Sequence, residues 1–188
     1  MIRAAIVGIG RWGRTLVEAV QGKSSLIRFT AGHNRTRSHA EEFCAGHGIA
    51  LKDDLEALLR DLEVDAVVFA TPHSEHGVQV ERSAAAGKHV FMEKPFTLDR
   101  ASAARAVTAA ERAGIVLGVA YPRRFHPNMR ELKARIDDGR LGTIAHCTTG
   151  SLTMNVFEQE LLLTLQVMPL GLLVTMPAPV PDIVAVRV

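Results

Sequence analysis

An acid, a base and a proline follow one another at the end of an apolar run in residues 91–97, which read FMEKPFT. Glu93, Lys94 and Pro95 come directly after residues 88–92, a predicted strand. A partly desolvated lysine at the mouth of a cleft can hydrogen-bond a substrate hydroxyl and take part in proton transfer. A cis bond before Pro95 would aim Lys94 inward. Taken alone, these residues fit an ion pair on a solvated turn better than a catalytic site. Other motifs in the sequence must therefore distinguish between the two.

A glycine-rich loop near the start of the chain has the spacing GxGxxG, with glycines at Gly8, Gly10 and Gly13. It follows the apolar run 4–7 and opens a predicted helix over 14–20, which is the context of dinucleotide-binding loops. The first glycine allows a tight turn, and the second lets a pyrophosphate approach the free N–H groups of the helix. The third permits close helix–strand packing. The loop therefore predicts a dinucleotide site, with a ligand-free glycine turn as the alternative.

The end of the second predicted strand, residues 26–31, bears on which dinucleotide is preferred. An Asp or Glu at this place commonly binds the free 2′-hydroxyl of NAD, but residues 31–37, AGHNRTR, contain neither. Asn34, Arg35 and Thr36 offer neutral and cationic donors that suit a 2′-phosphate. The sequence therefore favours NADP and leaves NAD possible. A solvated, basic helix start is the alternative.

Two histidines, His73 and His76, lie three residues apart in the stretch ATPHSEH that follows the predicted strand 65–70. No nearby cysteine or carboxylate pair completes a tetrahedral set, so we predict no metal site. We expect this loop to form the wall of the cofactor cleft instead, with His76 in the first turn of the next helix.

A pair of arginines, Arg123 and Arg124, follows the last predicted strand within YPRRFHPN, residues 121–128. Two guanidinium groups beside a cleft could hold a phosphate or a carboxylate bidentately. An exposed basic helix start is the alternative.

Short apolar runs alternate with amphipathic stretches through the first 120 residues. The predicted strands are 4–7, 26–31, 65–70, 88–92 and 115–120, and the predicted helices are 14–20, 38–47, 75–86 and 98–113. A further helix, capped by Asp53 or Asp54, is predicted to carry Leu55, Leu58 and Leu59 on one face. Repeated strand-then-helix units predict parallel strands joined by right-handed crossovers. Because the strands are apolar throughout, both faces of the sheet must be covered. We expect a doubly wound α/β sheet that binds ligands at the carboxyl ends of its strands.

The composition is that of an ordinary globular protein: 188 residues, 47% hydrophobic, 22% charged and a net charge of +2. Such a balance predicts neither a nucleic-acid partner nor a membrane surface. The N-terminus lacks the pattern of a signal peptide, and the apolar stretch 161–176 contains Pro169 and is shorter than the roughly 20 residues of a membrane span. Cys44 and Cys147 suggest reduced core thiols, so we expect a cytoplasmic location.

These motifs, in this order and spacing, resemble the Gfo/Idh/MocA family of nicotinamide-dependent oxidoreductases, the group of glucose-fructose oxidoreductase and inositol dehydrogenase. The resemblance covers residues 2–150 and is carried by VGIGRWG, ATPHSEHG, AAAGKHVFMEKPFTLD, GVAYPRRFHPN and GRLGTIAHC, of which EKP is the most specific. It implies an N-terminal Rossmann domain and a C-terminal α/β domain built on a large antiparallel sheet. It also implies reversible hydride transfer between a nicotinamide and a sugar- or cyclitol-like alcohol or ketone.

By this resemblance Lys94 is the catalytic lysine, near the nicotinamide and the substrate. The expected cofactor-binding residues are Gly8, Ile9, Gly10, Arg11, Trp12, Gly13, Asn34, Arg35, Thr36, Ala70, Thr71, Pro72, His76, Glu93, Lys94, Pro95 and Arg124. One departure is Pro122, which stands where members commonly carry a polar residue.

The larger departure is the end of the chain. No histidine follows His146, and residues 151–188 contain one basic residue, Arg187, and four of the eight prolines. We expect a Rossmann domain over 1–122, the start of the second domain over 123–150, and a vestigial tail over 151–188 in place of the antiparallel α/β domain.

A truncated or frame-shifted gene product would explain such a tail. The alternative function is therefore a catalytically incompetent fragment that retains only NAD(P) binding. The family's homo-oligomers form through the second domain, so we do not predict one for this chain. The residues that would select one polyol or sugar-like substrate belong to that domain too.

Overall fold

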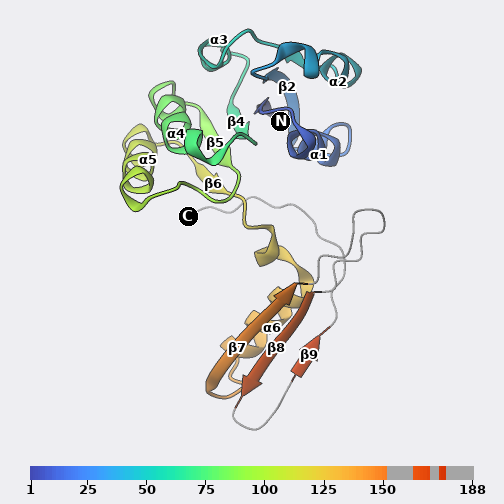
Figure 1. Cartoon of the computed structure of the whole chain (residues 1–188), viewed down its shortest axis with the longest axis vertical. Coiled ribbons are helices and arrows are strands. Elements are labelled where there is room, and N and C mark those ends of the chain that lie inside the picture. The colour runs from blue at the N-terminus through green and yellow to red at the C-terminus, as the bar shows by residue number, and fades with distance from the viewer. Residues whose placement is uncertain (152–162, 170–173, 177–188) are drawn as a thin grey trace. The chain divides into compact units, whose positions relative to one another are not determined.

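The computed structural model describes residues 1–151, 163–169 and 174–176, with side chains up to residue 144 (Figure 1). The chain divides into two compact units, one over residues 1–120 and one that begins at residue 121. Most of the tail predicted over 151–188 lies outside the described residues. Within the described ranges, no helix has the length and apolarity to cross a membrane.

The first unit is built on a six-stranded sheet with the order β3-β2-β1-β4-β5-β6, in which every pairing is parallel. Its strands are β1 (Ile2–Val7), β2 (Ile27–His33), β3 (Ala50–Leu51), β4 (Ala66–Phe69), β5 (His89–Met92) and β6 (Leu117–Val119). This is the Rossmann order, which reverses direction between β1 and β4. The five predicted strands are confirmed. The two-residue strand β3 was not predicted, because so short a run carries no periodicity.

Helices connect these strands. They are α1 (Arg11–Val20), α2 (Glu41–His47), α3 (Leu55–Leu59), α4 (His76–Ala85) and α5 (Arg100–Ala113), with 3-10 turns η1 (Arg37–His39) and η2 (His73–Glu75). The Asp54 side chain accepts the Ala57 N–H and caps α3 as predicted, and Asp99 caps α5 in the same way. The continuous helix predicted over 38–47 is wrong, because the chain breaks at the fully buried Ala40 between η1 and α2.

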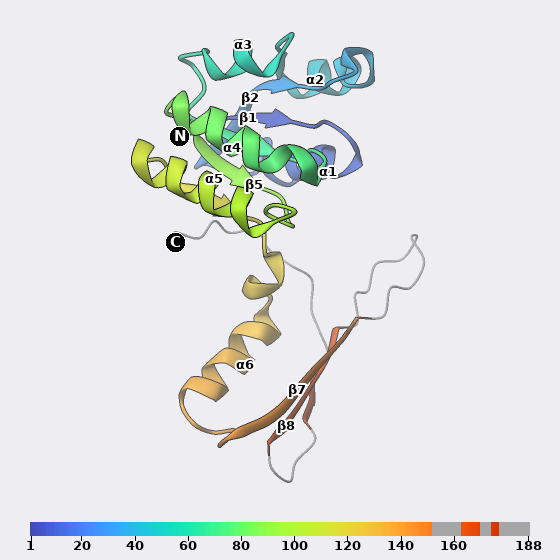
Figure 2. The ribbon, with the colours of Figure 1, turned by 60° about the vertical axis from the view of Figure 1, so that its left-hand side comes forward.

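Both faces of the sheet are covered, as the uniformly apolar strands predicted. Figure 1 and Figure 2 show α4 and α5 side by side on one face, with α1 and α2 on the other. One core contains side chains of α3, α4 and α5, among them Leu58, Val80 and Ala106. The second core contains Val17 of α1 and Cys44 of α2. Cys44 is a free, buried thiol, and burial raises its pKa.

The second unit begins with η3 (Pro122–Phe125) and α6 (Pro127–Asp137) and continues into three antiparallel strands. These are β7 (Ile144–Ser151), β8 (Leu163–Pro169) and β9 (Val174–Met176). Neither β8 nor β9 was predicted from the sequence. Apolar residues do alternate with Thr164 and Gln166 in LTLQVMP, which is the signal that was missed.

Candidate functional site

The carboxyl ends of the central strands lie in one row across the sheet of the first unit. Val7 of β1 pairs with His33 of β2 and with Phe69 of β4, and Phe69 pairs with Met92 of β5. The first residue after each strand donates its N–H to the last carbonyl of a neighbour: Gly8 to His33 at 3.0 Å, Ala70 to Val7 at 2.9 Å, Glu93 to Phe69 at 3.1 Å and Ala120 to Met92 at 2.8 Å. The loops that carry GxGxxG, ATPHSEH and EKP therefore leave the sheet next to one another.

The three glycines of the first loop have different surroundings. Gly8 has a φ of +89°, and a Cβ atom there would lie 2.6 Å from the Ala70 oxygen. At Gly13 a Cβ atom would lie 2.1 Å from the Gly8 oxygen. At Gly10 it would meet no atom within 4 Å, and this residue precedes α1 with no side-chain cap. Gly8 and Gly13 thus permit close packing, whereas Gly10 leaves an open backbone surface that fits a pyrophosphate.

The other residues of this loop divide between core and surface. The side chain of Ile9 is 2% exposed and packs in the core with α1 and α2, so only its backbone belongs to the loop surface. Arg11 and Trp12 are exposed. Of the residues between the glycines, these two are the side chains that a ligand could meet.

Asn34, at the end of β2, is held by two hydrogen bonds within the protein. Its Oδ1 accepts the Ile9 N–H at 2.9 Å, and its Nδ2 donates to the Thr36 carbonyl at 2.7 Å. The amide thereby joins the glycine loop to the loop after β2. Asn34 was predicted to bind the cofactor. Its internal role, which joins residues 25 positions apart, was not predicted.

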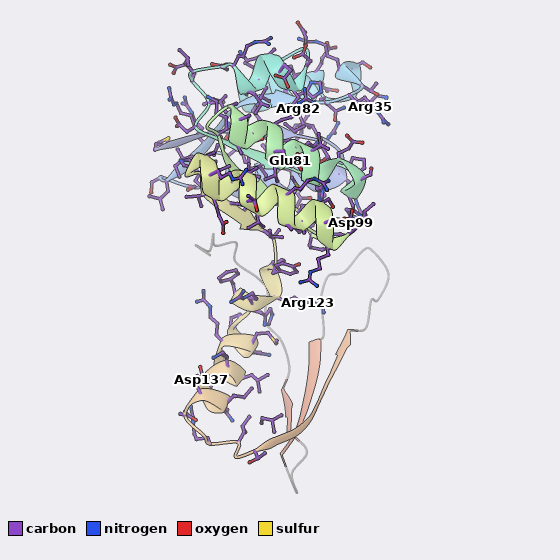
Figure 3. The ribbon with its side chains drawn as sticks, turned by 90° about the vertical axis from the view of Figure 1, so that its left-hand side faces the viewer. Arg35, Glu81, Arg82, Asp99, Arg123 and Asp137 are labelled. Atoms are coloured by element: carbon purple, nitrogen blue, oxygen red, sulfur yellow. The ribbon has the colours of Figure 1, made fainter. Side chains whose placement is uncertain are left out.

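Two arginines beside Asn34 differ in their partners. Arg37 donates to Glu41 at 3.1 Å and to Asp53 at 2.9 Å. Arg35 is exposed at the surface of the first unit (Figure 3), and it has no hydrogen-bond or ion-pair partner among the described residues. Of the two side chains, Arg35 is the one available to an anionic ligand.

The loop after β4 is tied together from within. The Thr71 hydroxyl donates to Oε1 of Gln79 at 2.6 Å. His76 is fully buried, and its ring nitrogens contact the carbonyls of Pro95 and Thr71. Pro72 is exposed at the surface of this loop. Gln79 was not predicted; the available signal was a polar residue three positions after His76, on the same face of α4.

His73 and His76 do not form a metal site. Their rings lie edge to face with centroids 5.5 Å apart, and both nitrogens of the second ring are engaged. In the part of the chain that the structure describes, no cluster of His, Cys, Asp and Glu is arranged to hold a metal ion.

The EKP loop has a free cation at its centre. The Lys94–Pro95 bond is cis, as considered from the sequence. Lys94 is exposed and has no ion pair among the described residues, so the ion-paired turn considered above is absent there. Glu93 is 8% exposed, and its carboxylate accepts the Lys94 N–H at 3.2 Å. Among the residues that the structure describes, the Lys94 ammonium is thus unpaired at the carboxyl edge of β5.

The two arginines of the YPRRFHPN stretch lie in the second unit. Arg123 and Arg124 are both exposed on η3, and Figure 3 labels the first of them. A role for Arg124 at the cofactor stays a prediction.

Comparison with known proteins agrees with this geometry. Residues 2–121 match the sequence model of an oxidoreductase family with an NAD-binding Rossmann fold, the Gfo/Idh/MocA family. Inositol 2-dehydrogenase of Rhizobium meliloti (strain 1021) is 33% identical over 80% of this chain and 45% of that protein. The scyllo-inositol 2-dehydrogenase (NAD(+)) of Bacillus subtilis (strain 168) is 32% identical over 75% of this chain and 42% of that protein.

Among solved structures, a 3-ketoreductase from Actinomadura kijaniata in complex with TDP-benzene and NADP superposes with a TM-score of 0.72 at 30% identity. The match covers 79% of this chain and 47% of that one. The chain thus spans less than half the length of the relatives it matches. Family model, relatives and fold agree, and the chain belongs to the Gfo/Idh/MocA family of oxidoreductases with an NAD(P)-binding Rossmann fold.

Proposed function

We propose that the protein binds NADP(H) in preference to NAD(H) and uses Lys94 in hydride transfer at a sugar- or cyclitol-like alcohol or ketone. The observation that carries the proposal is the ammonium of Lys94, which is unpaired among the described residues. It lies on the loop after β5, which leaves the sheet next to the loop after β4, and that loop in turn lies next to the glycine loop after β1. An exposed, unpaired cation at the carboxyl edge of a Rossmann sheet lies where a nicotinamide and a substrate hydroxyl would meet.

The residues of this edge fit a dinucleotide along its length. The open backbone at Gly10 and the N-terminus of α1 would receive the pyrophosphate. The guanidinium of Arg35, which has no partner in the part of the chain that the structure describes, would bind the 2′-phosphate. The neutral Asn34 beside it would not repel that phosphate. The EKP loop would lie at the nicotinamide end.

Residues of this edge would hold a nicotinamide whose chemistry, when bound, would be to take a hydride from the alcohol carbon or to return one to the ketone carbon. Lys94 would hydrogen-bond the reacting oxygen and orient it. In its neutral amine form it would accept the hydroxyl proton during oxidation, and the resulting ammonium would release that proton to solvent. The buried Glu93 would hold the Lys94 main chain in place through the N–H that it accepts. The names of the relatives support cyclitols and related sugars as the substrate class to test first.

A second candidate function is nucleotide binding without turnover. It is favoured by one observation, that residues 147–188 contain no histidine that could serve as a general acid or base. General acid–base groups contribute about 10²–10⁴-fold to a rate, and their loss need not affect binding.

Fluorescence titration of the purified chain with NADPH and with NADH tests the binding proposal. We expect tighter binding of NADPH, and Arg35→Ala should remove about tenfold of that preference, as loss of one charge-assisted hydrogen bond predicts. Arg37→Ala is the matched control, because its guanidinium is occupied by Glu41 and Asp53. Failure of the chain to bind either nucleotide would refute the proposal, and tighter binding of NADH would refute the preference.

Incubation with NADP and a panel of cyclitols and sugars, followed by NADPH absorbance, then separates the two functions. Turnover that is lost in Lys94→Ala would establish the oxidoreductase. Tight nucleotide binding without turnover on any panel member would instead support the second candidate.

A further inference from the structure

His76 joins two loops of the site from inside the protein. Its side chain is 0% exposed, although it carries two polar nitrogens. Nδ1 lies 2.9 Å from the Pro95 oxygen, and Nε2 lies 3.1 Å from the Thr71 oxygen. Pro95 directly follows Lys94 in the EKP loop, and Thr71 belongs to the loop after β4. One ring therefore bridges the loops that follow two neighbouring strands.

We infer that His76 is a positioning residue, which fixes the EKP loop against the loop after β4 and thereby sets where Lys94 stands. The inference rests on the proposed function of Lys94 and goes beyond it. His76 does not contact the ligand in this role, because the ring is fully buried and both of its nitrogens face main-chain carbonyls. This differs from the direct cofactor contact expected from the sequence.

The packing next to His76 supports a close fit between α4 and the end of the EKP loop. Gly77 is buried, and a Cβ atom there would lie 3.4 Å from Ser102 Cβ and 3.7 Å from Thr97 Cγ2. The first turn of α4 thus lies directly against the segment that runs from the EKP loop into α5. A buried polar side chain in such an interface is retained when its hydrogen bonds hold the two sides in one register.

The two contacts of the ring are not equivalent for this role. Both partners are carbonyl oxygens, which only accept, so a ring nitrogen bonds to them only when it carries hydrogen. A neutral imidazole carries hydrogen on one nitrogen. Fixing the EKP loop requires the hydrogen on Nδ1, which faces Pro95, whereas the contact from Nε2 to Thr71 lies within the loop before α4.

This asymmetry defines a pair of matched variants. In His76→Asn the amide nitrogen takes the place of Nδ1 and can still donate to Pro95. In His76→Gln the amide nitrogen takes the place of Nε2, so it reaches Thr71 and leaves Pro95 without a donor. Both variants are neutral amides, and the comparison isolates the bond to the EKP loop from the loss of the ring.

The binding experiment compares NADPH with 2′,5′-ADP, which lacks the nicotinamide end. We expect His76→Gln to weaken NADPH binding by about tenfold while the affinity for 2′,5′-ADP stays within about threefold. His76→Asn should keep both affinities within about threefold of the unaltered chain. Equal losses of affinity for the two ligands, or an unchanged NADPH affinity in His76→Gln, would overturn the inference. A residue with a merely structural role would affect the nicotinamide end and the adenosine end of the site alike.

Two ligand-free measurements separate this inference from the proposed function. Amide hydrogen exchange in residues 93–98 should be faster in His76→Gln than in His76→Asn, and equal rates would contradict the inference. In the unaltered chain, the nitrogen chemical shifts of the imidazole should show hydrogen on Nδ1, and a ring protonated at Nε2 alone would overturn it even if a variant fails to fold. If the unaltered chain binds no dinucleotide, the proposed function fails, and these two measurements still decide whether His76 fixes the loop.

Discussion

The main-chain N–H of Ile9 donates to Oδ1 of Asn34, which closes the glycine loop onto the end of β2. The same amide donates from Nδ2 to the Thr36 carbonyl. A carboxylate could replace the first bond but not the second, because it has no donor hydrogen. The asparagine therefore holds the two loops together through both hydrogen bonds, and it does so without adding a negative charge.

Asn34→Asp should reverse or abolish the preference for NADPH. The carboxylate can still accept from Ile9, but it repels a 2′-phosphate and suits a free 2′-hydroxyl. We expect the ratio of NADPH to NADH affinities to fall by about tenfold or more, as the removal or repulsion of a charged contact predicts. Asn34→Ala is the control, because it removes both hydrogen bonds without adding charge and should weaken both nucleotides alike. An unchanged ratio in the aspartate variant would contradict this account.

Gly10→Ala and Gly13→Ala should separate binding from stability. Alanine at position 10 meets no atom within 4 Å, so we expect the free energy of unfolding to change by less than about 1 kcal/mol while dinucleotide binding weakens. Alanine at position 13 would place Cβ 2.1 Å from the Gly8 oxygen and should destabilise the domain by about 2 kcal/mol or more. Urea unfolding and NADPH titration measure the two effects. A Gly13→Ala domain as stable as the parent would show that the loop can move away.

Replacement by alanine should lower the free energy of unfolding at Lys88 but leave it nearly unchanged at Lys94. Lys88 is 8% exposed, and its Nζ donates to the carbonyls of Asp61 at 2.8 Å and Val64 at 2.7 Å. Its removal leaves buried acceptors unpaired and should cost about 2–3 kcal/mol in urea unfolding. Lys94→Ala should change stability by less than about 0.5 kcal/mol, because that side chain is exposed and unpaired among the described residues. A large loss of stability in Lys94→Ala would mean that this lysine has a structural role.

Asp65→Asn should lower stability at neutral pH and lose its effect in acid. Arg3 donates to Asp65 from its side chain, at 2.6 Å and 3.1 Å, and from its main-chain N–H, at 2.8 Å. These bonds hold the pKa of Asp65 well below its usual range. The contribution is therefore complete above the unfolded pKa of about 4 and is lost as the pH falls through the folded value.

The expected loss in Asp65→Asn is about 1 kcal/mol at pH 7, since both side chains are roughly one-third exposed to solvent. Urea unfolding between neutral and acidic pH should show a constant difference from the unaltered chain above about pH 5 and a shrinking one below about pH 4. Asp53→Asn is the control, because Asp53 pairs with Arg37 while 92% exposed. A difference that does not vary with pH would show that the carboxylate charge does not matter.

The sequence by itself determined the order of strands and helices in residues 1–120 and the positions of the three motif loops. Uniformly apolar runs, aspartates at helix N-termini and glycines at helix C-termini act over a few neighbouring residues. The helices and strands that depend on them can therefore be predicted without knowing the fold. Two features of the fold lacked such local signals and were not predicted. The two-residue β3 carried no periodicity. The break at Ala40 occurs where its side chain packs in a core formed with residues far away in the sequence.

Tertiary structure decided which side chains of the loops are exposed and which hold the loops together. Asn34 is committed to Ile9, Thr71 to Gln79, and His76 to Pro95, whereas Lys94 and Arg35 stay unpaired among the described residues. The bond from His76 to Pro95 joins residues 19 positions apart, and the bond from Ile9 to Asn34 joins residues 25 apart. Such contacts exist only because parallel pairing brings the ends of β1, β2, β4 and β5 into one row, and no local pattern of residue types encodes that row.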